Sequence, residues 1–191
     1  MMVKEIINIR NISDEEYEKY FLLMSDEKKQ RVERFRFEDG KKRTVFGEML
    51  ARKMISFARK TNEEKIIFKA GKNGKPYTKS VDIHFNISHS DELILCAVNN
   101  TPIGVDIEKV REINPSVIKY TCNKDELEYI YENGISKEES LRRFFEIWTF
   151  KEATFKYKGT GLDDFHMLDF FDCKRQIERG FIGDYAYCII Y

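Results

Sequence analysis

The sequence has few of the residues from which structural zinc sites are built. Its 191 residues include three histidines and four cysteines, and no two cysteines form a Cys-x-x-Cys pair. A structural zinc site is therefore not expected. We expect instead that the cysteines stay reduced, as in a soluble cytoplasmic protein.

Long apolar runs and an excess of one charge are also missing. No run approaches the roughly 20 apolar residues that a membrane-spanning helix needs, and the opening residues MMVKEIINIR lack the apolar core of a signal peptide. Lys plus Arg equals Asp plus Glu, 33 against 33, which does not favour a general nucleic-acid binder. The sequence therefore predicts that neither a membrane nor a nucleic acid is a partner.

The residues that are plentiful predict a globular α+β protein. Hydrophobic residues make up 42% of the chain and aromatic residues 14%, which is enough for a hydrophobic core. The patterns run strand, helices, strands, and then repeat that order after a seam near residues 99–102. We expect two α+β halves, residues 1–100 and 101–191, which pack closely because no low-complexity linker separates them.

The expected elements follow from periodicity and helix caps. Expected strands cover residues 3–9, 66–68, 83–88, 93–98, 103–110, 167–171 and 185–191. Expected helices cover residues 14–24, 26–35 and 41–59, a helix capped by Asn123 and Glu126, and a helix from Ser136 to about Lys158 that ends at Gly159. The three strands between residues 83 and 110 are expected to be adjacent and antiparallel.

The stretch PIGVDIEKV, residues 102–110, places two carboxylates on one face of a strand. Asp106 and Glu108 are two residues apart, and Ile103, Val105 and Ile107 take the other face. One interpretation is the solvated face of an antiparallel strand. The other is a site for a hard cation such as Mg²⁺ or Mn²⁺, which offsets the repulsion between the acids. Gly104 would let another backbone or a ligand come close.

The stretch WTFKEATFKYKGTGL, residues 148–162, places a third acid beside lysines on a helix. Glu152 and Lys156 are four residues apart and share one face, with Lys151 next to Glu152. An ordinary surface ion pair explains that spacing. A metal-bound phosphate also explains it, since such a group needs one more ligand and positive charges for its oxygens.

Two shorter stretches add candidate binding groups. Ser88 and His89 lie near the end of the strand in FNISHSDE, where binding groups are common. Lys75 lies in the turn GKNGKPY, from which a lysine can reach a phosphate. The alternatives are a structural histidine and a plain exposed hairpin turn.

In combination and in this order, GKPY, FNISHS, IGVDIEKV and WTFKEATFKYKGTGL resemble the 4′-phosphopantetheinyl transferases of the larger, single-chain, surfactin-synthetase-activating type. The upstream stretch DEKKQRVERFRFEDGKKRTVFGEMLAR is similar to that family's basic helical segment, so the resemblance extends from about residue 20 to 165. It implies two similar α+β halves in a pseudo-twofold arrangement, with the active site in the cleft between them. It also implies transfer of the phosphopantetheine arm of coenzyme A to a serine of an acyl or peptidyl carrier protein, often in secondary metabolism, with release of adenosine 3′,5′-bisphosphate.

The resemblance assigns roles to particular residues. The Mg²⁺ ligands would be Asp106, Glu108 and Glu152. Coenzyme A would be held by Lys28, Arg31, Thr44, Lys75, Ser88, His89, Lys151 and Lys156. The catalytic set would be Glu152, Lys156 and Asp106, with Glu152 as the candidate base for the serine hydroxyl. The N-terminal half would bind the nucleotide end and the C-terminal half the metal and phosphates.

Three further expectations concern rival functions and partners. A Mg²⁺-dependent nucleotide phosphohydrolase would need the same acids and lysines, and a non-catalytic carrier-binding module of the same fold is the second alternative. A monomer is expected, because a single chain with two halves forms its own cleft. The acids Asp125, Glu126 and Glu128 would disfavour docking of an acidic carrier, so docking is expected either on the apolar region 113–120 or on the basic stretch 28–36.

Overall fold

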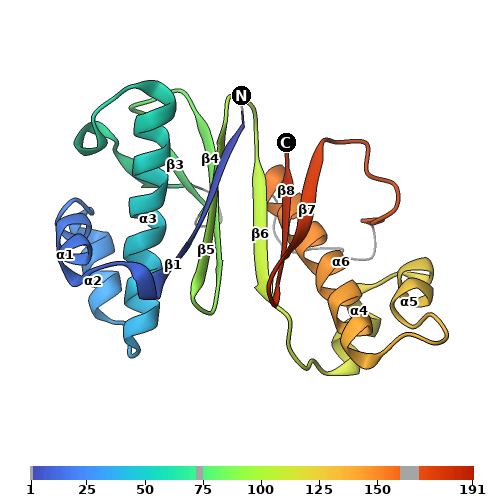
Figure 1. The fold of residues 1–191 in the computed structure, drawn as a ribbon. Helices are drawn as coiled ribbons and strands as arrows, with labels where there is room; N and C mark the ends of the chain where they lie inside the picture. Colours follow the sequence, from blue (N-terminus) through green and yellow to red (C-terminus); the bar gives the residue numbers. More distant parts are fainter. Residues whose placement is uncertain (1, 72–74, 160–167) are drawn as a thin grey trace.

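The strands form two three-stranded antiparallel sheets that lie side by side, each covered on its outer side by one long helix (Figure 1). The computed structural model describes residues 2–71, 75–159 and 168–191. One sheet has the strand order β1-β5-β4, the other has the order β6-β8-β7, and β2 pairs with β3 in a small separate ribbon. The mixed helix-and-strand architecture agrees with the α+β prediction.

The N-terminal half places α3 against the first sheet. Its elements are β1 (Val3–Asn8), η1 (Ile9–Asn11), α1 (Asp14–Leu22), α2 (Asp26–Glu33), α3 (Glu38–Arg59), η2 (Glu63–Lys65), β2 (Phe68–Ala70), β3 (Pro76–Thr78), β4 (His84–Ser90) and β5 (Leu93–Asn99). On β5, Ile94, Cys96 and Val98 belong to the core shared with α3. Leu95 and Ala97 belong to a second core that lies between the two sheets.

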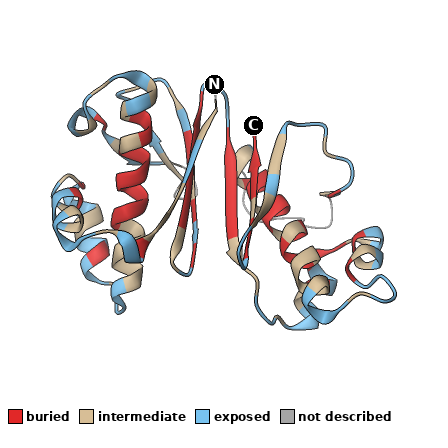
Figure 2. Ribbon diagram, in the orientation of Figure 1, coloured by how far each residue is buried: buried red, intermediate tan, exposed pale blue. Residues whose placement is uncertain are grey.

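The C-terminal half repeats this layering with α6. Its elements are β6 (Gly104–Lys109), α4 (Pro115–Thr121), α5 (Lys124–Ile130), α6 (Lys137–Lys158), β7 (Ile177–Ile182) and β8 (Tyr185–Ile190). On β8, Ala186, Cys188 and Ile190 belong to the core shared with α6, whereas Ile189 belongs to the core between the sheets. Figure 2 shows the resulting concentration of buried positions on β5, β6 and the long helices.

Local sequence chemistry accounts for the helix ends. Ser13, Asn123 and Ser136 each accept a hydrogen bond from the backbone N–H three residues later, as expected of N-caps. Gly159 ends α6 in the left-handed conformation, with φ of 70°, which glycine adopts without a steric penalty. None of the helices in the described residues combines the length and the hydropathy of a membrane-spanning segment.

One expected strand pairing is wrong. β4 and β5 are adjacent and antiparallel as predicted, but β6 joins the other sheet instead of continuing the first. The reason is that β5 has no free edge, because β1 pairs along its other side with Val3 opposite Val98. The chain therefore leaves the first sheet after Asn99, and β6 pairs with β8.

Other boundaries differ from the sequence pattern. The strand expected at 66–68 lies instead at Phe68–Ala70, and the pattern did not reveal β3, α4 or β7. The expected strand at 167–171 begins outside the described residues, and residues 168–171 are not a strand. The side chain of Phe170 is instead buried in the core and packs edge-on against Phe150. Its backbone N–H donates to Glu126 rather than to a neighbouring strand.

Candidate active site

Strand β6 carries the predicted pair of acids on one face. Val105 and Ile107 are fully buried in the core between the sheets, which confirms the predicted alternation. Asp106 lies opposite Cys188 on β8 and is 2% exposed, and Glu108 is partly buried. The interpretation of Asp106 as part of a solvated strand face is therefore wrong.

Helix α6 approaches β6 closely because residue 104 is glycine. A Cβ atom at Gly104 would lie 2.1 Å from the carbonyl oxygen of Ala153 and 2.4 Å from the backbone nitrogen of Tyr157. Such contacts are sterically impossible, so only glycine permits this approach. This approach places Lys156 beside Asp106 on β6. The Nζ of Lys156 donates a hydrogen bond of 2.6 Å to Asp106 Oδ1.

Strand β4, from the other sheet, supplies the third side of this site. The hydroxyl of Ser88 donates to Asp106 Oδ1 over 2.7 Å and accepts from Lys156 Nζ over 3.0 Å. The hydroxyl of Ser90 donates to Glu108 Oε2, also over 2.7 Å. Ser88 was predicted from the sequence, whereas Ser90 was not. We call Asp106, Glu108, Glu152 and Lys156 the acidic cluster.

The pKa values of all three acids are raised. Burial is the largest cause in each case. Burial and the negative charge of Asp106 raise the pKa of Glu152 to about 7, while Lys156 opposes the rise. Glu108 adds to the rise, so both acids of the strand act on the pKa of an acid of the helix.

The donor atoms of the acidic cluster fit a hard cation. The atoms that Asp106, Glu108 and Glu152 can offer are carboxylate oxygens, the ligands that Mg²⁺ prefers. Asp106 Oδ2 is buried and makes no hydrogen bond within the described residues. Over the same residues, no three acidic, His or Cys side chains are already arranged as a metal site. The ammonium group of Lys156 instead provides the positive charge at Asp106 Oδ1.

Lys75 and His89 lie close to Lys156. The Nζ of Lys75 donates to the carbonyl oxygens of Lys156 and Ile103, and burial together with the Lys156 charge lowers its pKa. Desolvation and the charges of Arg43 and Lys156 lower the pKa of His89. A cavity of about 340 Å³ adjoins Lys75 and Tyr157, between β4 and the start of β6. Lys75 therefore lies against the backbone of α6 at Lys156, whereas His89 is an exposed residue of β4.

The three upstream candidates make other contacts. Lys28 pairs with the buried Glu48 on α3, with Nζ 2.7 Å from Oε2. Arg31 is exposed on α2, and the hydroxyl of Thr44 donates to the carbonyl of Gly40 within α3. Among the residues that the structure describes, no hydrogen bond connects these three side chains to the acidic cluster.

Lys151 does not line the site, which corrects the expectation that it neutralises phosphate oxygens. Its side chain is fully buried, and its Nζ donates to Glu126 Oε2 over 2.6 Å and to the carbonyl of Thr121. Glu126 is equally buried, so it does not contribute to an acidic surface either. The two residues form an internal ion pair between α5 and α6. Asp125 and Glu128 remain exposed on α5.

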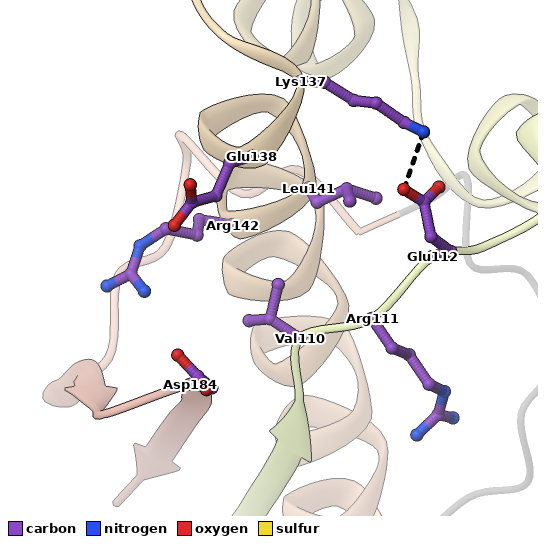
Figure 3. Close-up of a pocket in the computed structure, with 8 residues that line it drawn as sticks. All are labelled: Val110, Arg111, Glu112, Lys137, Glu138, Leu141, Arg142 and Asp184. Carbon is purple, nitrogen blue, oxygen red and sulfur yellow. Dashed lines mark ion pairs between the residues drawn. The ribbon is translucent and has the colours of Figure 1, made fainter.

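A surface cavity of about 370 Å³ lies beyond the C-terminal end of β6 (Figure 3). Its wall includes Val110 and Arg111 after β6, the start of α6, and Asp184 in the turn between β7 and β8. Glu112 and Lys137 form an ion pair of 2.6 Å at its rim. Arg111 also lies 3.8 Å from Glu108, so this cavity adjoins the acidic cluster.

Two family models match successive parts of the chain. The family model described as "4'-phosphopantetheinyl transferase superfamily" matches residues 102–187, and the model "4'-phosphopantetheinyl transferase, N-terminal" matches residues 11–101. The chain is 34% identical over 163 residues to 4'-phosphopantetheinyl transferase Sfp of Bacillus subtilis, a match that covers 85% of this chain and 72% of that protein.

Two further relatives are matched over a smaller share of their length. The chain is 37% identical over 139 residues to 4'-phosphopantetheinyl transferase gsp of Aneurinibacillus migulanus, which covers 73% of this chain and 57% of gsp. It is 35% identical over 140 residues to 4'-phosphopantetheinyl transferase psf-1 of Bacillus pumilus, which covers 73% of this chain and 59% of psf-1. The chain belongs to the 4'-phosphopantetheinyl transferase superfamily and is similar to its Sfp-type members.

Proposed function

We propose that the protein transfers the 4′-phosphopantetheine group of coenzyme A to a serine of an apo carrier protein and releases adenosine 3′,5′-bisphosphate. The observation that carries the proposal is the convergence of Asp106, Glu108, Glu152 and Lys156 at the contact between β6 and α6, in a chain of this superfamily. The two halves would form the pseudo-twofold arrangement of the family, with coenzyme A in the cleft between them.

In the proposed site, Asp106, Glu108 and Glu152 would hold Mg²⁺. When bound, the ion neutralises charge on the diphosphate of coenzyme A. Lys156, which already bonds Asp106 and Ser88, would neutralise a further phosphate oxygen. Lys75 and His89 would contact the nucleotide end, and Lys28, Arg31 and Thr44 would complete that pocket. Most of the rate enhancement would come from positioning and charge neutralisation.

In the transfer step, the serine oxygen of the carrier forms a bond to the phosphorus that carries pantetheine. The bond between that phosphorus and the oxygen bridging to the adenosine-side phosphate breaks. Glu152 accepts the serine proton in this proposal, because Asp106 and Glu108 are each held by a serine hydroxyl. Within the described residues, no hydrogen bond engages the Glu152 carboxylate, which leaves it available to the incoming hydroxyl.

Mass spectrometry of a carrier protein tests the proposal. Apo carrier incubated with coenzyme A, Mg²⁺ and this protein should gain the mass of one phosphopantetheine arm. The Asp106→Asn variant should fail to modify it, and Asp184→Asn, which changes an acid outside the acidic cluster, should behave as wild type. Adenosine 3′,5′-bisphosphate formed without a carrier would support the phosphohydrolase alternative. Carrier binding without any chemistry would support the non-catalytic module.

We also propose where the carrier binds. In region 113–120, which includes most of α4, Ile118 is buried and Ile113 and Val117 pack against the core, so Tyr120, at 72% exposed, is the large apolar side chain that this region offers to a partner. The region begins two residues after Arg111, which lies 3.8 Å from Glu108. Tyr120→Ala should raise the KM for the carrier and leave the KM for coenzyme A unchanged. The competing basic surface predicts that outcome for Lys29→Glu instead.

The monomer expectation is retained as part of the proposal. The acidic cluster and the serines that contact it come from β4, β6 and α6 of one chain, so no partner subunit is needed to form it. Sedimentation in the presence of coenzyme A and Mg²⁺ should give the mass of one chain. A dimer that dissociates with loss of activity would contradict this part of the proposal.

A further inference from the structure

The edge of β4 and the edge of β6 are joined by side chains, although they belong to different sheets. Asn86, Ser88 and Ser90 alternate along β4 and therefore point to the same side. Asn86 Oδ1 accepts the backbone N–H of Val105 over 2.8 Å. Ser90 Oγ accepts the backbone N–H of Lys109 over 3.1 Å. Side chains of β4 thus occupy edge N–H groups of β6 that have no partner strand.

Ser90 makes a second contact that fixes its hydroxyl group in one orientation. The residue is 6% exposed, and its Oγ lies 2.7 Å from Glu108 Oε2. A hydroxyl has one proton, and the N–H of Lys109 already uses an Oγ lone pair. The proton must therefore point at the Glu108 carboxylate. Ser90 in this way ties that carboxylate to the backbone of the strand that carries it.

The other partner of Glu108 is weaker. Arg111 lies 3.8 Å from Glu108 Oε2, and its side chain is 61% exposed. An exposed ion pair at that distance holds a carboxylate only loosely. The hydrogen bond from Ser90 is both shorter and buried, so it is the contact that restricts the rotamer of Glu108.

We propose that Ser90 is a positioning residue, which holds Glu108 in the orientation required for binding a divalent cation. This inference rests on the proposed function, in which Glu108 is a cation ligand. Partners that orient a ligating carboxylate commonly change metal affinity 10–100-fold when they are removed. Ser90 acts on Glu108 from a strand of the other sheet.

The test is the affinity of the protein for Mn²⁺, measured by electron paramagnetic resonance with coenzyme A present. We expect Ser90→Ala to weaken Mn²⁺ binding at least about tenfold. Its half-saturating Mg²⁺ concentration for transfer should rise in parallel, while the KM for coenzyme A at saturating Mg²⁺ stays unchanged. Unchanged Mn²⁺ affinity in a folded Ser90→Ala protein would overturn the inference.

Two controls separate positioning from general damage. Ser80 also accepts a backbone N–H, that of Ile67, over 3.1 Å, but lies away from the acidic cluster. Ser80→Ala should leave Mn²⁺ affinity unchanged. Asn86→Ala removes a bond between β4 and β6 without touching an acid, so it should lower stability and leave Mn²⁺ affinity within about twofold. Equal loss of affinity in Asn86→Ala and Ser90→Ala would assign the effect to the joint between the halves and overturn the positioning role.

The outcome is independent of whether transfer occurs. If wild type binds Mn²⁺ and Ser90→Ala weakens binding, but no carrier is modified, the positioning role stands and the proposed function fails. If carriers are modified and Ser90→Ala binds Mn²⁺ like wild type, the proposed function stands and the positioning role fails.

Discussion

Removing the charge of Glu152 should stabilise the metal-free protein at neutral pH. The pKa of Glu152 is raised from 4.5 to about 7 by burial and by the neighbouring carboxylate of Asp106, with Glu108 adding to the rise and Lys156 opposing it. At about 1.4 kcal/mol per pH unit, the pKa rise corresponds to at most about 3.5 kcal/mol. Glu152 is only partly buried, so solvent screening reduces the expected effect to about 1–2 kcal/mol.

The sign follows from proton linkage. The folded protein holds the Glu152 proton more tightly than the unfolded chain, so stability falls as the pH rises from about 4.5 to about 7. Glu152→Gln cannot ionise at this position, so its stability does not fall for this reason as the pH rises. Without metal, the variant should be about 1–2 kcal/mol more stable than wild type at pH 8 and similar to it at pH 4.5.

Urea denaturation in the presence of a chelator measures this difference directly. Free energies of unfolding at pH 4.5 and pH 8 are compared for wild type, Glu152→Gln and Glu128→Gln, which removes an exposed acid on α5. Glu128→Gln should show no such gain at pH 8. If Glu152→Gln is no more stable than wild type at pH 8, burial and the neighbouring carboxylates do not destabilise the charged form of Glu152, and the cluster is misassigned.

Two further predictions concern packing and the buried ion pair. Gly104→Ala should lower the free energy of unfolding by at least about 2 kcal/mol and reduce transfer, because its Cβ would collide with the α6 backbone at Ala153. In the control Gly47→Ala, the added Cβ would have its nearest contact at 3.4 Å, so stability should change little. Equal losses of stability in urea denaturation would contradict the close approach. Lys151→Met should lower the free energy of unfolding by about 3–5 kcal/mol, because it leaves the buried charge of Glu126 without its partner. Adding Glu126→Gln should recover part of that loss. A Lys151→Met protein of wild-type stability would refute the pairing.

The sequence predicted the parts of the site that depend on spacing within one element. The two-residue spacing of Asp106 and Glu108 placed them on one strand face, as found. The four-residue spacing of Glu152 and Lys156 predicted a shared helix face, and Lys156 does reach Asp106. Gly104 was correctly predicted as a point of close approach, although the partner was not identified.

The features that the sequence did not reveal depend on residues far apart in the chain. Lys151 lies next to Glu152 in the sequence, as a phosphate-binding lysine would. Only its contact with Glu126, 25 residues away, shows that it is internal. β6 belongs to the second sheet because β1 pairs with β5, and no local sequence pattern encodes that pairing. Ser90 carried a signal that could have been used, because it shares the face of Ser88 on the same strand.

The central claim is that three acids from β6 and α6 together hold one divalent cation against the diphosphate of coenzyme A. Titration of Mn²⁺ with coenzyme A present, followed by water-proton relaxation, tests it most directly. We predict one tightly bound ion per wild-type chain, and loss of that ion in Asp106→Asn and in Glu152→Gln alike. Unchanged Mn²⁺ binding in either variant would show that the acids of the strand and the helix do not share a cation.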